Sequence, residues 1–255
     1  MNVLTIKGVS IGEGMPKIIV PLMGKTEKQI LNEAEAVKLL NPDIVEWRVD
    51  VFEKANDREA VTKLISKLRK SLEDKLFLFT FRTHKEGGSM EMDESSYLAL
   101  LESAIQTKDI DLIDIELFSG DANVKALVSL AEENNVYVVM SNHDFEKTPS
   151  KDEILSRLRK MQELGAHIPK MAVMPNDTGD LLTLLDATYT MKTKYADRPI
   201  ITMSMAATGL ISRLSGEVFG SACTFGAGEE ASAPGQIPVS ELRSVLDILH
   251  KNTQG

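Results

Sequence analysis

Short apolar segments recur along the whole chain, separated by longer stretches in which apolar residues return at helical spacing. The apolar segments cover residues 17–24, 44–50, 76–83, 112–118, 136–144, 168–175, 199–206 and 218–225. Continuous apolar segments of this kind are typical of parallel strands that are buried on both faces. We therefore expect eight strands with helices between them.

The stretches between these segments carry helix signals. Residues 26–29 and 150–153 both have the form of a capping box. Regular alternation of strand and helix, with no break in composition, predicts an α/β fold, a (β/α)8 TIM barrel spanning residues 1–255 as one domain. Residues 3–6 and 9–12 predict an N-terminal β-hairpin that closes the bottom of the barrel. An open, doubly wound sheet is the alternative.

Composition limits the kinds of partner and the cellular location that we expect for this protein. A net charge of -9 disfavours nucleic acid and anionic lipid as general partners. No stretch approaches the roughly 18 consecutive apolar residues of a membrane span. The first residues lack the pattern of a signal peptide, so we expect a cytoplasmic protein. The one cysteine, Cys223, lies in an apolar segment and is expected to be a buried residue, not a catalytic thiol.

Lys170 lies inside the apolar segment 168–175. Burial favours the neutral form of an amine, and a neutral lysine is a nucleophile that forms Schiff bases with ketones and aldehydes. The alternatives are an ion pair with a buried carboxylate, or a side chain that reaches solvent at the end of the strand.

Polar residues occur at every second position near the ends of several predicted strands, so they share the face that points into the barrel. These residues are Glu46, Arg48 and Asp50; Thr80, Arg82 and His84; Asp114 and Glu116; and Ser141 and His143. Any one pair could be a structural ion pair. Their recurrence on several strands favours a polar active site at the C-terminal mouth, where barrels carry their catalytic groups.

His143 ends the segment that precedes the Lys170 segment, so the two residues lie on neighbouring strands of a barrel. A histidine beside a buried amine is equipped to move the proton alpha to an imine, although a structural histidine is the alternative. The histidine spacings do not indicate a metal site. The glycine-rich residues 224–228 could bind phosphate, which keeps a class I aldolase acting on a phosphorylated sugar as an alternative.

Six sequence blocks carry a more specific resemblance. They are Glu46-Trp47-Arg48-Val49-Asp50, residues 79–83 with 86–88, residues 141–145, residues 169–175, Ile211-Ser212-Arg213 and residues 232–236. Together they resemble the type I 3-dehydroquinate dehydratases of the shikimate pathway, over nearly the whole chain. The resemblance implies a lyase that converts 3-dehydroquinate to 3-dehydroshikimate, needs no metal or organic cofactor, and takes a cyclic hydroxy keto acid as its small-molecule substrate. We also expect a homodimer.

The resemblance also implies residue roles. Lys170 would form the imine, His143 would transfer the proton, and Glu86 would orient His143. Arg213 would bind the substrate carboxylate. Glu46, Arg48 and Arg82 would bind the ring hydroxyls, and Ser232 and Gln236 would reach the substrate from a lid formed by residues 226–236. Pro21 and Ala206-Ala207 depart from the family pattern and affect the expected polarity of the pocket. A non-catalytic, metabolite-binding barrel remains a third possibility.

Overall fold

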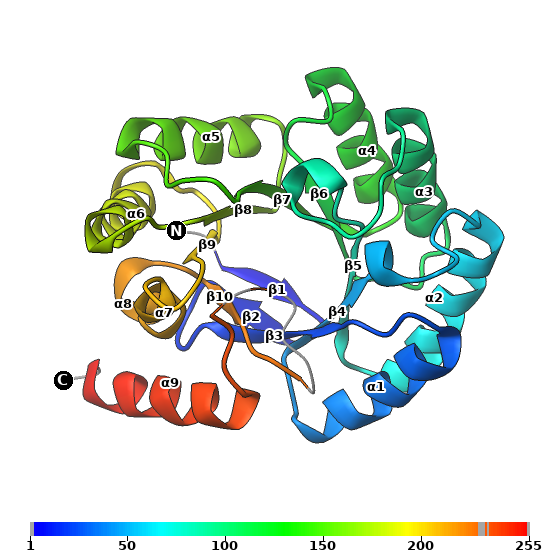
Figure 1. Cartoon of the computed structure of the whole chain (residues 1–255), viewed down its shortest axis with the longest axis horizontal. Helices are drawn as coiled ribbons and strands as arrows, with labels where there is room; N and C mark the ends of the chain where they lie inside the picture. Colours follow the sequence, from blue (N-terminus) through cyan, green and yellow to red (C-terminus); the bar gives the residue numbers. More distant parts are fainter. Residues whose placement is uncertain (1–2, 229–232, 234, 254–255) are drawn as a thin grey trace.

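The computed structural model describes residues 3–228, 233 and 235–253, and it shows parallel strands in a ring surrounded by helices (Figure 1). The strands of the ring are β3 (Lys17–Leu22), β4 (Ile44–Arg48), β5 (Leu76–Thr80), β6 (Leu112–Glu116), β7 (Tyr137–Asp144), β8 (Ile168–Val173), β9 (Ile201–Ser204) and β10 (Cys223–Phe225). Consecutive strands pair in parallel, and β10 pairs with β3. A parallel bridge between Ile200 and Ser221 joins the two remaining edges. The predicted TIM barrel is confirmed, and the open sheet is wrong.

The helices cover the outside of the ring (Figure 1). They are α1 (Glu27–Leu39), α2 (Arg58–Leu72), α3 (Glu94–Gln106), α4 (Asp121–Glu133), α5 (Lys151–Glu163), α6 (Thr178–Thr190), α7 (Leu210–Leu214), α8 (Gly216–Phe219) and α9 (Val239–Thr253), with short turns of 3-10 helix at η1 (Val49–Val51) and η2 (His84–Glu86) and a π-helical turn at η3 (Met191–Tyr195). Thr26 and Gln29 form the predicted capping box at the start of α1. In the part of the chain that is described, no helix is long and apolar enough to cross a membrane.

The hairpin of β1 (Leu4–Ile6) and β2 (Val9–Ile11) closes the bottom of the barrel, as expected. Lys7 and Gly8 form its turn with φ of +46° and +82°, the left-handed conformations that suit a tight hairpin. Ile6 and Ile11 pack on the apolar residues inside the barrel. The Lys7 ammonium lies 2.6 Å from the carboxylate of Asp111, which directly precedes β6. The hairpin therefore covers the N-terminal ends of the strands and leaves the other end open.

Successive side chains along each strand point alternately into two apolar cores. Outward residues such as Trp47, Phe79 and Val138 pack against the helices. Inward residues such as Ile44 and Leu112 fill the lower part of the barrel. The inward positions become polar toward the C-terminal ends of the strands, for example at buried Glu46, Asp114 and Lys170. Removing water from apolar side chains on both faces stabilises the fold by roughly 25 cal/mol per Å² buried, and this fixes the backbone that carries the polar residues.

Three sequence predictions need correction. The segment 218–225 is not one strand: its first residues belong to α8, where Val218 is exposed, and Gly220, at φ +121°, ends that helix before the short β10. Strand β4 ends at Arg48, so Asp50 lies in η1. Strand β5 ends at Thr80, and His84 starts η2 with an exposed side chain instead of pointing into the barrel. In the second and third cases a 3-10 turn ends the period of two early, whereas in the first a helical turn delays the start of the strand.

Candidate active site

A cavity of about 230 Å³ lies at the C-terminal ends of the strands. Its lining contains Glu46, Arg48, Arg82, Glu86, Gly87, His143, Phe145, Lys170, Ala172, Met203, Met205, Arg213, Phe225, Ala233 and Gln236. Eight of the nine residues predicted for the site are therefore brought together. The ninth, Ser232, lies outside the described residues, as does much of the predicted lid.

Lys170 enters this cavity from the middle of β8, and only 3% of its surface is exposed. Its Nζ lies 3.3 Å from Oδ2 of Asp114 and 4.9 Å from the centre of the Phe225 ring. A carboxylate and an aromatic face both stabilise an ammonium. The ion-pair alternative considered for this lysine is therefore present in the structure. A reaction that needs the neutral amine requires a base in the same cavity.

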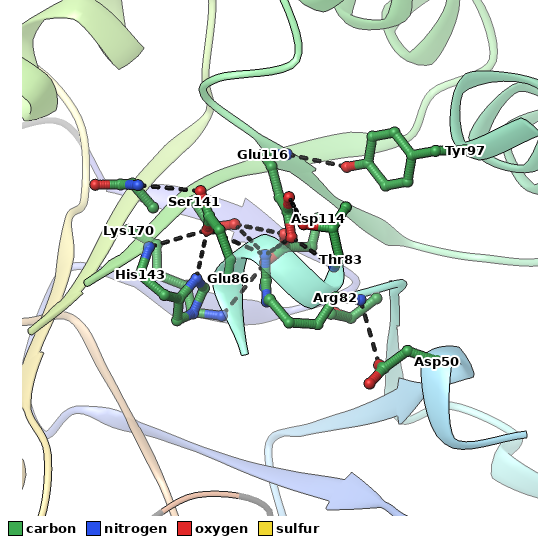
Figure 2. Close-up of polar contacts among 12 residues, drawn as sticks. Asp50, Arg82, Thr83, Glu86, Tyr97, Asp114, Glu116, Ser141, His143 and Lys170 are labelled. Atoms are coloured by element: carbon green, nitrogen blue, oxygen red, sulfur yellow. Dashed lines mark hydrogen bonds and ion pairs between the residues drawn. The ribbon is translucent and has the colours of Figure 1, made fainter. Parts of the chain in front are cut away.

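Arg82 is the centre of the polar cluster drawn in Figure 2. Its Nη2 lies 2.8 Å from Asp114, and its Nη1 donates to Glu116 at 2.8 Å and to the Ser141 hydroxyl at 2.9 Å. Burial opposes the charge of Arg82, but the negative charges of Asp114 and Glu116 outweigh it and raise the Arg82 pKa well above its usual value. Burial also opposes the Asp114 charge, and Arg82 and Lys170 keep the pKa of Asp114 below its usual value. One guanidinium thus holds β6 and β7 together at the cavity floor.

His143 and Glu86 form the second polar unit, at the side of Lys170 (Figure 2). Nδ1 of His143 lies 2.9 Å from Oε2 of Glu86, and the backbone N–H of His143 donates to the same oxygen at 2.9 Å. Burial, followed by the charges of Arg82 and Lys170, lowers the pKa of His143 well below its usual value. His143 is therefore a neutral imidazole near pH 7. With Nδ1 directed at Glu86, its Nε2 is the nitrogen left to accept a proton.

Burial, together with the nearby charge of Glu116, raises the pKa of Glu86 to about 8. Arg82 and the amide of Asn142 oppose this rise. Glu86 is thus close to the point of ionisation at neutral pH. The two carboxyl oxygens of Glu86 lie within hydrogen-bond distance of Nδ2 of Asn142 and of the backbone N and Nδ1 of His143. N–H groups that donate to these oxygens stabilise the ionised form of Glu86.

Glu46 and Arg48 come from β4 and line the wall of the cavity that lies across the ring from the Lys170 strand, β8. The Arg48 guanidinium donates to both oxygens of Asp50, at 2.8 Å and 2.9 Å, and Glu46 accepts a bond from the Thr80 hydroxyl at 2.9 Å. Arg48 and Asp50, which the period of two assigned to one face, therefore meet even though the strand ends between them. The bidentate pair keeps Arg48 in one orientation at the cavity edge.

Arg213 projects from α7 and is 2% exposed, with Nη1 3.7 Å from the sulfur of Met203. Burial lowers the pKa of Arg213 to about 10, so the guanidinium is still charged at neutral pH. An anion bound in the cavity would offset the cost of desolvating this charge. Arg213 is thus suited to bind a carboxylate.

The backbone of residues 226–227 argues against the predicted phosphate site. The N–H of Gly226 donates to the Ile19 carbonyl at 3.0 Å, and that of Ala227 donates to the Ile237 carbonyl at 2.8 Å. Donors already engaged inside the fold are not available to a phosphate. Two backbone donors of the segment 224–228 are therefore engaged inside the fold, which weighs against the phosphate-binding alternative.

The two departures from the family pattern have different consequences. Pro21 lines a separate cavity of about 250 Å³, together with Met23 and Leu40. Ala206 adopts φ +56°, and a Cβ at Gly235 would lie 2.4 Å from its carbonyl oxygen. Ala206 therefore supports the segment that carries Gln236 through close backbone contact.

Sequence reasoning missed Asn142, and also Arg157 of α5, whose Nη1 donates to Oδ1 of Asn142 at 2.9 Å. Asn142 is buried on the outward face of β7, where Val138 and Met140 are apolar. A polar residue out of phase with Ser141 and His143 was the available signal. Asn142 also lines a second cavity, of about 700 Å³, which shares Glu86 and His143 with the first.

A TIM barrel whose mouth holds a buried lysine, a neutral histidine and paired carboxylates has the features of a barrel enzyme. A model of the type I 3-dehydroquinase family matches residues 18–253. The chain is 98% identical to a 3-dehydroquinate dehydratase of Bacillus subtilis (strain 168), covering 100% of both sequences. The chain therefore belongs to the type I 3-dehydroquinase family, and the predicted resemblance is confirmed.

More distant relatives agree. A 3-dehydroquinate dehydratase of Listeria innocua is 56% identical over 251 residues, covering 98% of this chain and 99% of the relative. The crystal structure of the type I 3-dehydroquinate dehydratase from Clostridium difficile, with covalently modified comenic acid, superposes with a TM-score of 0.96 at 50% identity, covering 98% of this chain and 99% of that chain.

Proposed function

We propose that this enzyme dehydrates 3-dehydroquinate to 3-dehydroshikimate through a Schiff base on Lys170. The observation that carries the proposal is the meeting, in one cavity, of Lys170, which is 3% exposed, with His143 and its partner Glu86. The names of the relatives support the substrate. The covalently modified ligand in the Clostridium difficile relative supports covalent chemistry in the family.

The reaction begins when the Lys170 amine loses a proton, for which neutral His143 is a base in the same cavity. The amine adds to the ketone carbon, the protonated His143 returns its proton to the carbinolamine hydroxyl, and loss of that hydroxyl as water leaves a protonated imine beside a neutral His143. Nε2 of His143 then removes the proton alpha to the imine, and the electron pair of that C–H bond moves toward the iminium nitrogen to give an enamine. The enamine expels the beta hydroxyl, which leaves as water with the proton from His143. Hydrolysis of the new imine releases the conjugated enone and returns Lys170.

The other residues that line the cavity bind the substrate. Arg213 binds the carboxylate, as the family resemblance implies, and its guanidinium lines the cavity and is charged at neutral pH. Glu46, Arg48 and Arg82 bind the ring hydroxyls from the opposite wall. Gln236 reaches the ligand from the segment after β10, and Ser232 is proposed to do so from the same segment.

The proposal extends to the state of the protein. It functions as a cytoplasmic homodimer of single-barrel chains, as the family resemblance implies. Light scattering during size-exclusion chromatography tests this, with a mass near twice 28.1 kDa expected and a mass near 28.1 kDa contradicting the dimer.

Absorbance spectroscopy with 3-dehydroquinate tests the function. The product is a conjugated enone that absorbs in the ultraviolet, whereas the substrate does not. We expect absorbance to rise on addition of enzyme, without phosphate and without added metal. A protein that binds 3-dehydroquinate but produces no absorbance change would be a metabolite-binding barrel instead.

A further inference from the structure

A chain of hydrogen bonds leads from the outer helix α5 to the proposed catalytic histidine. Nη1 of Arg157 donates to Oδ1 of Asn142 at 2.9 Å. Nδ2 of the same amide donates to Oε1 of Glu86 at 3.0 Å, and Oε2 of Glu86 lies 2.9 Å from Nδ1 of His143. Asn142 is 4% exposed, so its amide is largely shielded from bulk solvent.

Arg157 decides which end of the Asn142 amide faces Glu86. A guanidinium has only N–H donors, so it must meet the amide oxygen. The amide NH2 is then directed at Glu86. Rotating the amide by half a turn would place NH2 against the guanidinium and leave two donors facing each other. Arg157 is held for this role by a 2.7 Å bond from its Nε to Glu153 and by the Phe118 ring, 5.6 Å from its guanidinium carbon.

The orientation of the amide bears on the proton of Glu86. Oε2 already accepts the backbone N–H of His143, so an acid proton would belong on Oε1. There it would meet the N–H of Asn142. A rotated Asn142 would instead offer Oε1 an acceptor and stabilise the protonated acid. Because the pKa of Glu86 is about 8, one donor is enough to change its state near neutral pH.

We propose that Arg157 is a positioning residue that acts through Asn142 to favour the ionised form of Glu86, and thereby strengthens His143 as a base. This inference rests on the proposed function of His143. The other charged groups that act on Glu86 are Arg82, Glu116 and Asp114, and those that act on His143 are Arg82, Lys170 and Arg48. Arg157 lies outside the cavity lining and can be changed without altering the groups that bind substrate.

The test is carbon-13 NMR titration of the Glu86 carboxyl in the free enzyme, with Glu86→Gln used to assign the resonance. In Arg157→Met the titration midpoint should rise by about one pH unit, the scale of one hydrogen bond to a charged group. The acid limb of kcat/KM should move to higher pH by the same amount. Arg157→Lys retains a donor for the amide oxygen and should restore both values. The matched control is Arg159→Met, since Arg159 lies on the same helix but contacts the Tyr195 ring.

An unchanged Glu86 midpoint in Arg157→Met overturns the inference. If that variant does not fold, Asn142→Asp gives an independent test, because it replaces the N–H facing Oε1 by an oxygen. Its Glu86 midpoint should rise even with Arg157 present, and an unchanged value contradicts the inference. The titration involves no substrate, whereas trapping of an imine on Lys170 tests the proposed function, so the two can fail separately.

Discussion

At the scale of single residues, neighbouring charges and burial give each polar group of the cavity a distinct state. At the cavity floor Asp114 lies close to both Arg82 and Lys170, which keeps the pKa of this carboxyl below its usual value even though it is buried. At the side, burial dominates: it lowers the pKa of His143 and raises that of Glu86. The site therefore combines a cluster of ion pairs with a neutral imidazole that lies beside a carboxyl ionising near pH 8.

His143→Ala should still form the imine, with solvent taking the Lys170 proton in place of His143, but it should turn over slowly. Removal of a positioned acid/base group typically costs about 10²- to 10⁴-fold in rate. We expect kcat to fall by that range while a substrate adduct on Lys170 accumulates, measured by absorbance and by intact mass. His84→Ala is the control, because His84 is exposed. A kcat for His143→Ala within a few-fold of the parent enzyme would exclude this residue as the acid/base.

The pH dependence of kcat/KM follows from Glu86. Burial and the Glu116 charge raise the pKa of Glu86 to about 8, so this carboxyl is protonated below that pH and ionised above it. A carboxylate increases the basicity of the imidazole it contacts. We therefore expect kcat/KM in the free enzyme to increase as pH rises through this region. Glu86→Gln should remove that limb and lower the plateau; a limb that persists in this variant must come from another group.

Residue patterns predicted much of the site, for a physical reason. Inward positions of a buried strand are constrained to alternate, which identified Glu46 and Asp114, whereas Lys170 was identified as a charged residue inside an apolar segment. The predicted inward position of His84 was wrong because the chain turns into η2 after β5, and a 3-10 turn does not preserve the period of two. Arg157 could not be predicted, since helical spacing gives no indication of which strand residue an arginine will meet.

At the scale of elements, the segments that follow the strands complete the cavity. Arg213 comes from α7 after β9, and Gln236 comes from the segment between β10 and α9. The apolar pattern predicted the strands but not their ends: the segment 218–225 divides into α8 and β10 because Gly220 allows a positive φ between them. Turns of this kind depend on local backbone conformation, which the apolar pattern does not encode.

Gln236→Ala should weaken binding of the substrate more than it slows the chemistry. The side chain lines the cavity from the segment after β10, and β8 and β9 lie between β10 and the His143 strand β7 in the ring. Loss of one hydrogen bond to the ligand predicts a rise in KM of roughly tenfold, or about 1.4 kcal/mol. Steady-state kinetics measure this, with Gln106→Ala at the exposed end of α3 as the control. Unchanged kcat/KM would remove Gln236 from the binding residues.

At the scale of the whole molecule, the ring is closed, and strands that follow one another in the sequence are therefore also neighbours in space. Chain order alone therefore predicted that His143 and Lys170 lie on adjacent strands, and β7 and β8 do pair, with Ser141 opposite Lys170. The hairpin closes the bottom, so the polar mouth is the accessible end. The alternation of segments predicted this topology because a parallel barrel is the compact solution for eight such units.

Chelation should leave the enzyme active. Among the described residues, no group of three or more His, Cys, Asp or Glu side chains is arranged to hold a metal ion. The negative charges near Lys170 are instead compensated by Arg82. We expect kcat and KM to be unchanged after dialysis against EDTA. Loss of activity that a divalent ion restores would contradict this expectation.

The most direct test of the Schiff-base mechanism is reduction with borohydride in the presence of substrate or product, followed by peptide mass spectrometry. Borohydride delivers hydride to the imine carbon and converts the imine into a stable secondary amine. We expect inactivation that requires the ligand, with one ligand-derived mass addition located on Lys170, and no addition in Lys170→Met. An adduct on another lysine, or full activity after treatment of an enzyme that is turning over substrate, would contradict the mechanism.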